Sequence, residues 1–94
     1  MTTVGGLEPT ETRLLLCAAI MLGDVVAFGD GNDRRWHLTY RETNRSYDRT
    51  TAVEELIREG WVADRETAPT LTVKGRAMLD EHGGKVLKRY RETT

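Results

Sequence analysis

An unbroken run of nine apolar residues, Leu14 to Leu22, constrains the fold of this chain more than any other feature. Pro9 and Thr10 precede the run and Gly23 follows it, which is the pattern of a helix that begins near Pro9 or Thr10 and ends at Gly23. A helix with no polar face must be covered on all sides. We therefore expect either the central helix of a small domain or a helix that also faces a second subunit.

The second possibility predicts a symmetric homodimer. A chain of 94 residues with one cysteine has a modest core and no internal disulfide, so a partner subunit would add to its stability. The interface would combine one side of the first helix with apolar residues near the C-terminus. The expected interface residues are Leu14, Cys17, Met21, Val86, Leu87 and Tyr90.

Length and composition predict one domain without a membrane span. The apolar run is far shorter than the roughly 18 residues that a transmembrane helix requires. The first residues have neither the basic nor the apolar region of a secretory signal, which predicts a cytoplasmic location. We expect a flexible N-terminus over residues 1–8, a domain over residues 9–83, and a basic C-terminal extension with a helical pattern over residues 84–94.

Two short elements after the first helix predict a β-hairpin. Residues 24–28 predict a short strand, since four apolar residues follow Asp24, and residues 29–33 are rich in Gly, Asp and Asn, as in a tight turn. In the alternating segment that follows, Trp36, Leu38 and Tyr40 share one face, and this face should pack inward. Residues 41–46 have no apolar period and predict a polar loop.

A second helix is predicted from about Arg49 to Glu59, capped by Asp48 or Thr50 and ended by Gly60. A second hairpin should follow, with strands at residues 61–64 and 70–73, and we expect Trp61 to be buried. A third helix should begin after Thr72. Its expected inward residues are Ala77, Met78 and His82, with Leu79 beside them. The predicted fold class is therefore α+β, with three main helices and two β-hairpins.

The segments Thr51–Val62 and Leu71–Leu79 resemble winged-helix transcription regulators. The resemblance lies in a Leu-x-x-x-Gly-x-Val pattern from Leu56 to Val62 and a Leu-Thr-x-x-Gly-x-x-x-Leu pattern that begins at Leu71. It implies that residues 49–59 form a DNA-reading helix and residues 64–69 a wing. The chain departs from the family before the reading helix, where residues 24–47 predict strands and loops instead of a short helix.

Arginines alternate with aromatic residues between positions 34 and 49, where five arginines stand against Glu42 and Asp48. Arginine matches phosphates and stacks on rings, so this band could bind nucleic acid. The alternative is that the aromatics serve the core while the arginines balance acidic segments elsewhere. The predicted DNA-binding residues are Arg35, Arg41, Arg45, Arg49, Thr50, Thr51, Arg58 and Arg65.

The titratable residues favour no catalytic or metal site. Cys17 lies in the apolar run, His82 in a last helical turn, and His37 on the polar side of a strand, without a metal-ligand spacing. The sequence Gly29-Asp30-Gly31 is better explained as a turn than as a phosphate loop. We therefore expect no enzyme activity, no metal and no cofactor.

Two functional hypotheses remain. The first is a small DNA-binding regulator or accessory protein that binds double-stranded DNA, of the kind that phages and mobile elements carry. The second is a module that binds or inhibits a host protein. The second would use the acidic residues Glu54, Glu55 and Glu59 or the apolar first helix. Contiguous arginines on the surface would favour the first hypothesis, and interruption by Glu54 and Glu55 would favour the second.

Overall fold

The structure, a computed structural model, describes residues 8–29, 33–40, 42–65, 68–86 and 88. These residues form an α+β arrangement with two antiparallel sheets. In chain order the elements are α1 (Glu11–Met21), β1 (Val25–Phe28), β2 (Arg35–Tyr40), β3 (Arg45–Asp48), α2 (Thr50–Arg58), β4 (Val62–Ala63), β5 (Thr70–Leu71) and α3 (Val73–His82). A helical turn at residues 84–86 follows α3.

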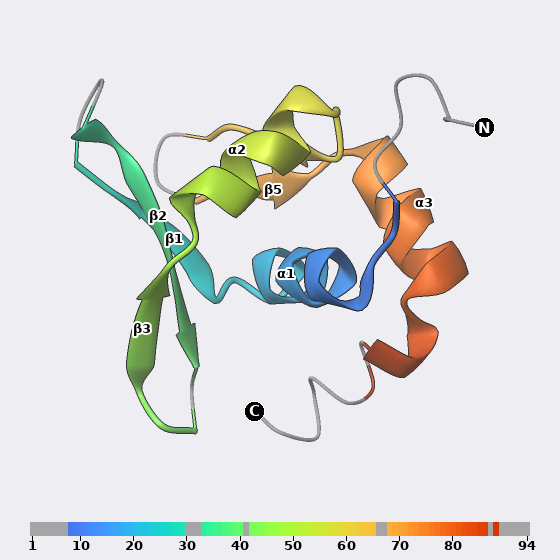
Figure 1. Cartoon of the computed structure of the whole chain (residues 1–94), viewed down its shortest axis with the longest axis horizontal. Helices are drawn as coiled ribbons and strands as arrows, with labels where there is room; N and C mark the ends of the chain where they lie inside the picture. The colour runs from blue at the N-terminus through green and yellow to red at the C-terminus, as the bar shows by residue number, and fades with distance from the viewer. Residues whose placement is uncertain (1–7, 30–32, 41, 66–67, 87, 89–94) are drawn as a thin grey trace.

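Helix α1 lies at the centre of the molecule (Figure 1). The β1–β3 sheet stands on one side of it and α3 on the other, while α2 and the β4–β5 hairpin lie along a third side. Six residues of α1 are buried, from Leu14 to Ile20. The predicted central helix is therefore confirmed, and its lack of a polar face follows from being surrounded.

The ends of α1 follow from local chemistry. The side chain of Thr10 caps the first turn by accepting a hydrogen bond from the backbone N–H of Arg13 at 3.3 Å. Gly23 ends the helix with a φ of +83°, a left-handed conformation that glycine adopts without strain. Both ends agree with the prediction from the sequence.

The first sheet has one more strand than expected. The β1–β2 hairpin is present, with Val25 opposite Leu38, but β3 then pairs with β2 in a second antiparallel ladder. The predicted loop over residues 41–46 is therefore wrong in its last part, because Arg45 and Ser46 belong to β3. All four residues of β3 are exposed, so the strand has no apolar alternation that could have indicated it.

The two faces of this sheet differ. Trp36 and Leu38 are buried against the core, and Tyr40, on the same face, is half-buried. Residues directly opposite in a ladder share a face, so Tyr47 lies beside Leu38, and Arg45 beside Tyr40. The core-facing side of the sheet therefore continues at its β3 edge as an exposed Arg-Tyr surface.

Helix α2 joins the sheet to the second hairpin. Val53 and Leu56 are its buried residues, and Gly60 ends the helix segment with a φ of +82°. Trp61, next in the chain, is 1% exposed, as expected. In the β4–β5 ladder Val62 lies opposite Leu71, which confirms the second hairpin, although its strands are shorter than predicted.

Helix α3 begins as predicted, with Thr72 as its cap; the Thr72 side chain accepts from the backbone N–H of Gly75 at 3.1 Å. The predicted inward residues are only partly correct. Leu79 is buried and Met78 is half-buried, but Ala77 and His82 are exposed. The buried face runs through Gly75 and Leu79, four residues apart, because α3 packs through its glycine directly onto the backbone of Trp61.

The residues predicted for a dimer interface lie mainly in the core of the single chain. Leu14, Cys17 and Val86 are 3%, 0% and 8% exposed, and Met21 is half-buried. They therefore offer little surface to a second subunit, because the chain's own elements already cover them. Leu87 and Tyr90 lie outside the described residues. The homodimer itself stays a prediction.

Burial raises the pKa of the Cys17 thiol to about 12. The group is therefore protonated at neutral pH and acts as a small apolar side chain at the centre of α1.

The described part of the C-terminal extension packs on the domain, since Val86 belongs to the same apolar cluster as Leu79. The division into a domain over residues 9–83 and an extension over residues 84–94 stays a prediction. Within the described ranges, no helix has both the length and the apolar character needed to cross a membrane.

Candidate nucleic-acid interface

The arginine-aromatic band forms its most continuous surface where β3 leads into α2. Arg45 and Tyr47 lie on the same side of β3, and the Tyr47 side chain packs edge-on against Tyr40, with ring centroids 5.7 Å apart. The guanidinium of Arg49 lies over the Tyr47 ring, 5.3 Å from its centroid. Arg45, Tyr47 and Arg49 therefore form one line of side chains, which we call the β3–α2 strip.

Arg35 does not belong to this strip. Its position in β2 alternates with Trp36, so it lies on the opposite face of the sheet. There its Nη1 atom forms an ion pair with Oδ2 of Asp48 at 3.0 Å. The predicted set of contiguous arginines is thus divided between the two faces of the sheet.

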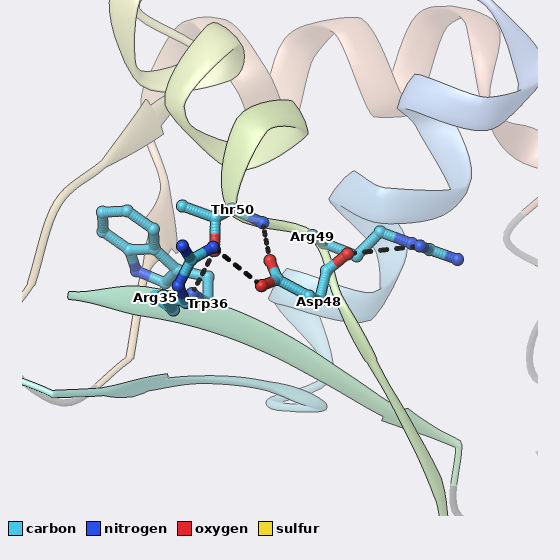
Figure 2. A network of polar contacts seen from close by, with 5 residues as sticks. All are labelled: Arg35, Trp36, Asp48, Arg49 and Thr50. Atoms are coloured by element: carbon cyan, nitrogen blue, oxygen red, sulfur yellow. Dashed lines mark hydrogen bonds and ion pairs between the residues drawn. The ribbon is translucent and has the colours of Figure 1, made fainter. Parts of the chain in front are cut away.

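Asp48 and Thr50 form hydrogen bonds at the point where the chain passes from β3 into α2 (Figure 2). The backbone N–H of Thr50 donates to Oδ1 of Asp48 at 2.8 Å, and the Thr50 hydroxyl oxygen accepts from the backbone N–H of Trp36 at 3.1 Å. The predicted cap by Asp48 or Thr50 is wrong, because Arg49 is the N-cap residue and its side chain makes no capping hydrogen bond; the Asp48 carboxylate instead holds the first backbone N–H of the helix. Thr50, predicted to contact DNA, has both groups engaged within the chain, and we assign it a positioning role.

Hydrogen bonds from the side chain and then the backbone N–H of Thr50, with a smaller contribution from Arg35, lower the pKa of Asp48 from 3.8 to about 2. A lowered pKa in the folded state means that the carboxylate contributes stability above its unfolded pKa. This contribution is lost as the pH falls through the window from 3.8 to about 2.

We therefore expect the stability difference between the native chain and Asp48→Asn to be constant near neutral pH and to shrink between pH 3.8 and about pH 2. Both chains contain the other acidic residues, so the effects of those residues on stability cancel in the difference. Urea unfolding of the two chains at a series of pH values measures it. A difference that is the same at neutral pH and at the lower end of this window would contradict the assigned role of Asp48.

Helix α2 exposes fewer carboxylates than its sequence indicates. Thr51, Glu54 and Arg58 are its fully exposed positions. Glu55 is half-buried and forms an ion pair with Arg13 of α1, with Oε1 and Nε 3.2 Å apart. The exposed face of α2 therefore presents one carboxylate beside one arginine, and the acidic surface expected from Glu54 and Glu55 together is reduced to Glu54.

The β4–β5 connection is tied to the first sheet through Arg34. Its guanidinium forms an ion pair with Asp64 at 3.0 Å, donates to the backbone carbonyl of Arg65, and lies 5.3 Å from the centroid of the Trp36 ring. Arg65 itself is exposed. The structure thus brings Arg34, from the predicted band, beside the segment that the family resemblance compares with a wing.

Several residues of the candidate site fall outside these contacts. Arg41 lies outside the described residues, as do positions 66 and 67 of the compared wing segment. Within the described ranges, no three His, Cys, Asp or Glu side chains are grouped closely enough to hold a metal ion.

The ion pairs Arg13–Glu55 and Arg34–Asp64 were not predicted. Their partners are far apart in the sequence, and no local pattern indicates them.

Comparison with known proteins gives no relative: no family model, no curated protein and no solved structure matches the chain.

Proposed function

We propose that the chain is a winged-helix-like domain that binds double-stranded DNA and acts as a small regulator or accessory protein by occupying its site. The observation that carries this proposal is the β3–α2 strip, in which the guanidinium of Arg49 is 5.3 Å from the centre of the Tyr47 ring and Arg45 lies on the same side of β3. The strip leads directly into α2, whose second residue, Thr51, is exposed.

Arginine and tyrosine suit the sugar-phosphate backbone. A guanidinium presents several N–H donors in a planar fork that matches phosphate oxygens, and stacking on a ring restricts its movement before binding. Contacts of this kind fix the position and orientation of a protein on a duplex. The strip would place α2 on the DNA, where Thr51 and Arg58 are its exposed positions able to donate hydrogen bonds.

The order α2, β4–β5 hairpin, α3 supports the comparison with winged-helix domains, in which a reading helix precedes a wing and a last helix. In chain order, the β1–β3 sheet precedes α2 at the position where that family has a short helix. In our proposal β3 has the role of that helix, because it brings arginines to the start of α2, where the Asp48 carboxylate accepts a hydrogen bond from the backbone N–H of Thr50.

The pairing of Glu55 with Arg13 adds further support. A carboxylate that faces a phosphate backbone lowers the affinity. With Glu55 paired, the fully exposed face of α2 together with Arg45 and Arg49 holds three arginines against Glu54.

Replacing Arg45 or Arg49 with Ala is expected to weaken DNA binding by a similar factor for all duplex sequences. Each change should also flatten the dependence of log affinity on log salt by about 1 unit, because one phosphate contact and its released counterion are lost. An electrophoretic shift titration with mixed duplex DNA at several salt concentrations measures both effects.

The matched control is Arg76→Ala. Arg76 lies on α3, which Figure 1 shows on the side of the molecule away from β3, and it pairs with Asp80 at 3.4 Å. The control removes the same charge from an exposed arginine and should leave the salt dependence nearly unchanged. An equal loss in Arg76→Ala and Arg49→Ala would mean that net charge, rather than the β3–α2 strip, determines the affinity.

A host protein as the partner is the alternative hypothesis. Most of the apolar surface of α1, which that hypothesis could use, is buried in the chain's own core. The remaining surface for it is the exposed part of α2, with Glu54 and Arg58 as the first positions to change.

A further inference from the structure

We propose that a pocket between α1, β2 and the start of α2 binds a small, largely apolar molecule that carries one carboxylate. The pocket has a volume of about 340 Å³ and its lining includes residues from all three elements. This inference goes beyond the proposed DNA binding and does not depend on it.

The size and the walls of the pocket suit a small organic molecule. Pockets that hold such ligands have volumes of roughly 300–1,000 Å³ and mainly apolar walls with a few polar groups. Here Leu15 and Leu16 contribute from α1, Leu38 from β2, and Ala52 from α2. Leu16 and Leu38 are also core residues, 4% and 1% exposed, so this part of the wall is held in place by the packing of the domain.

Arg49 provides the group that recognises a carboxylate. It lines the pocket, and Figure 2 shows its side chain extending away from the contact between Asp48 and Thr50. Its Nη1 atom donates a long hydrogen bond, 3.4 Å, to the carbonyl of Asp48, and within the described ranges no carboxylate pairs with it. A bidentate bond from a guanidinium to a carboxylate would use its other N–H groups.

The other charged residues of the lining narrow the choice of ligand. Arg13 is engaged twice within the chain, by the Glu55 carboxylate at 3.2 Å and by the carbonyl of Glu8 at 3.0 Å. With Arg13 engaged, Arg49 is the remaining arginine of the lining, and its guanidinium can pair with one carboxylate. The lining therefore fits an apolar body with a single carboxylate better than a phosphate ester.

The test compares two probes of similar shape, 2-naphthoate and its uncharged analogue 2-naphthalenemethanol. Each is titrated into the whole chain without DNA, and binding is followed through the backbone amide signals in NMR spectra. The naphthoate should bind about tenfold more tightly than the alcohol, as a charge-assisted pair with Arg49 implies. Signals from α1, β2 and the start of α2 should move most.

Three variants separate the parts of the proposal. Ala52→Leu fills the pocket and should weaken the binding of both probes at least about tenfold, because the larger side chain occupies the space of the ligand. Arg49→Gln should lower the affinity for the naphthoate to that for the alcohol, and it should leave the affinity for the alcohol unchanged. Arg76→Gln, the charge-matched control on α3, should change neither affinity.

The proposal is overturned if the two probes bind the native chain equally, if neither binds saturably, or if the signals that move lie outside the three elements. It is also overturned if Arg49→Gln leaves the preference for the carboxylate intact, whether or not Ala52→Leu folds.

Discussion

Replacement of Trp61 by Ala is expected to lower the free energy of unfolding by about 3–5 kcal/mol, as for other large buried aromatic residues. The Trp61 side chain is 1% exposed and is the largest fully buried side chain described. Its backbone also joins two elements, since its N–H donates to the carbonyl of Leu56 at 2.9 Å and its carbonyl accepts from Thr72 at 3.0 Å. A cavity at this point would loosen the packing of the end of α2 and of the start of α3 around Trp61.

Such a loss is a large fraction of the total, because domains of this size are stable by only about 5–15 kcal/mol. Urea unfolding followed by circular dichroism measures the change, and Trp36 remains as a fluorescent probe in the variant. Trp61→Phe, which keeps a buried ring, should lose clearly less. A change below about 1 kcal/mol in Trp61→Ala would contradict the packing described for this residue.

Gly75→Ala is expected to destabilise the domain by about 2–3 kcal/mol, although Ala is the better helix former by about 1 kcal/mol. A Cβ atom at Gly75 would lie 1.9 Å from the carbonyl oxygen of Trp61. That oxygen is held by the backbone N–H of Thr72, so α3 would have to move away from the hairpin.

Gly84→Ala is the matched control, because Gly84 lies in a helical turn and a Cβ atom there would meet nothing within 4 Å. This variant should be as stable as the native chain or slightly more stable. Thermal unfolding of the two variants side by side measures the contrast. Equal stability of Gly75→Ala and Gly84→Ala would show that α3 does not approach Trp61 as closely as described.

The sequence predicted the helices and the hairpins well where short-range chemistry determines them. Thr10 and Thr72 cap helices through hydrogen bonds to residues three positions ahead, and Gly23 and Gly60 adopt left-handed conformations after helices. Each of these signals acts within a few residues, so it can be read without knowledge of the tertiary structure.

The sequence does not predict strand β3, and the reason is physical. A strand is recognised in a sequence by alternation of apolar and polar residues, and this pattern arises because one face is buried. The residues of β3 are exposed on both faces and are held by the backbone ladder to β2. The predicted inward face of α3 is wrong for a related reason. Gly75 packs closely on its neighbour because it has no side chain, so it gives no apolar signal in the sequence.

The candidate site was predicted residue by residue but not as a surface. The spacing of the arginines does not reveal that Arg35 lies on the other face from Arg45, because this depends on the register of β3. Nor does it reveal that Glu55 is paired with Arg13, 42 positions earlier in the chain. Arg35 therefore does not add to the positive charge of the proposed interface, and the paired Glu55 lowers that charge less than its sequence position indicates.

If the β3–α2 strip binds a DNA backbone, the affinity of the native chain for mixed duplex DNA must depend on salt. We expect measurable binding at about 50 mM salt and a linear fall of log affinity with log salt, with a slope of about 2 or more from the contacts of Arg45 and Arg49. No affinity at about 50 mM salt, or an affinity that does not change with salt, would contradict it.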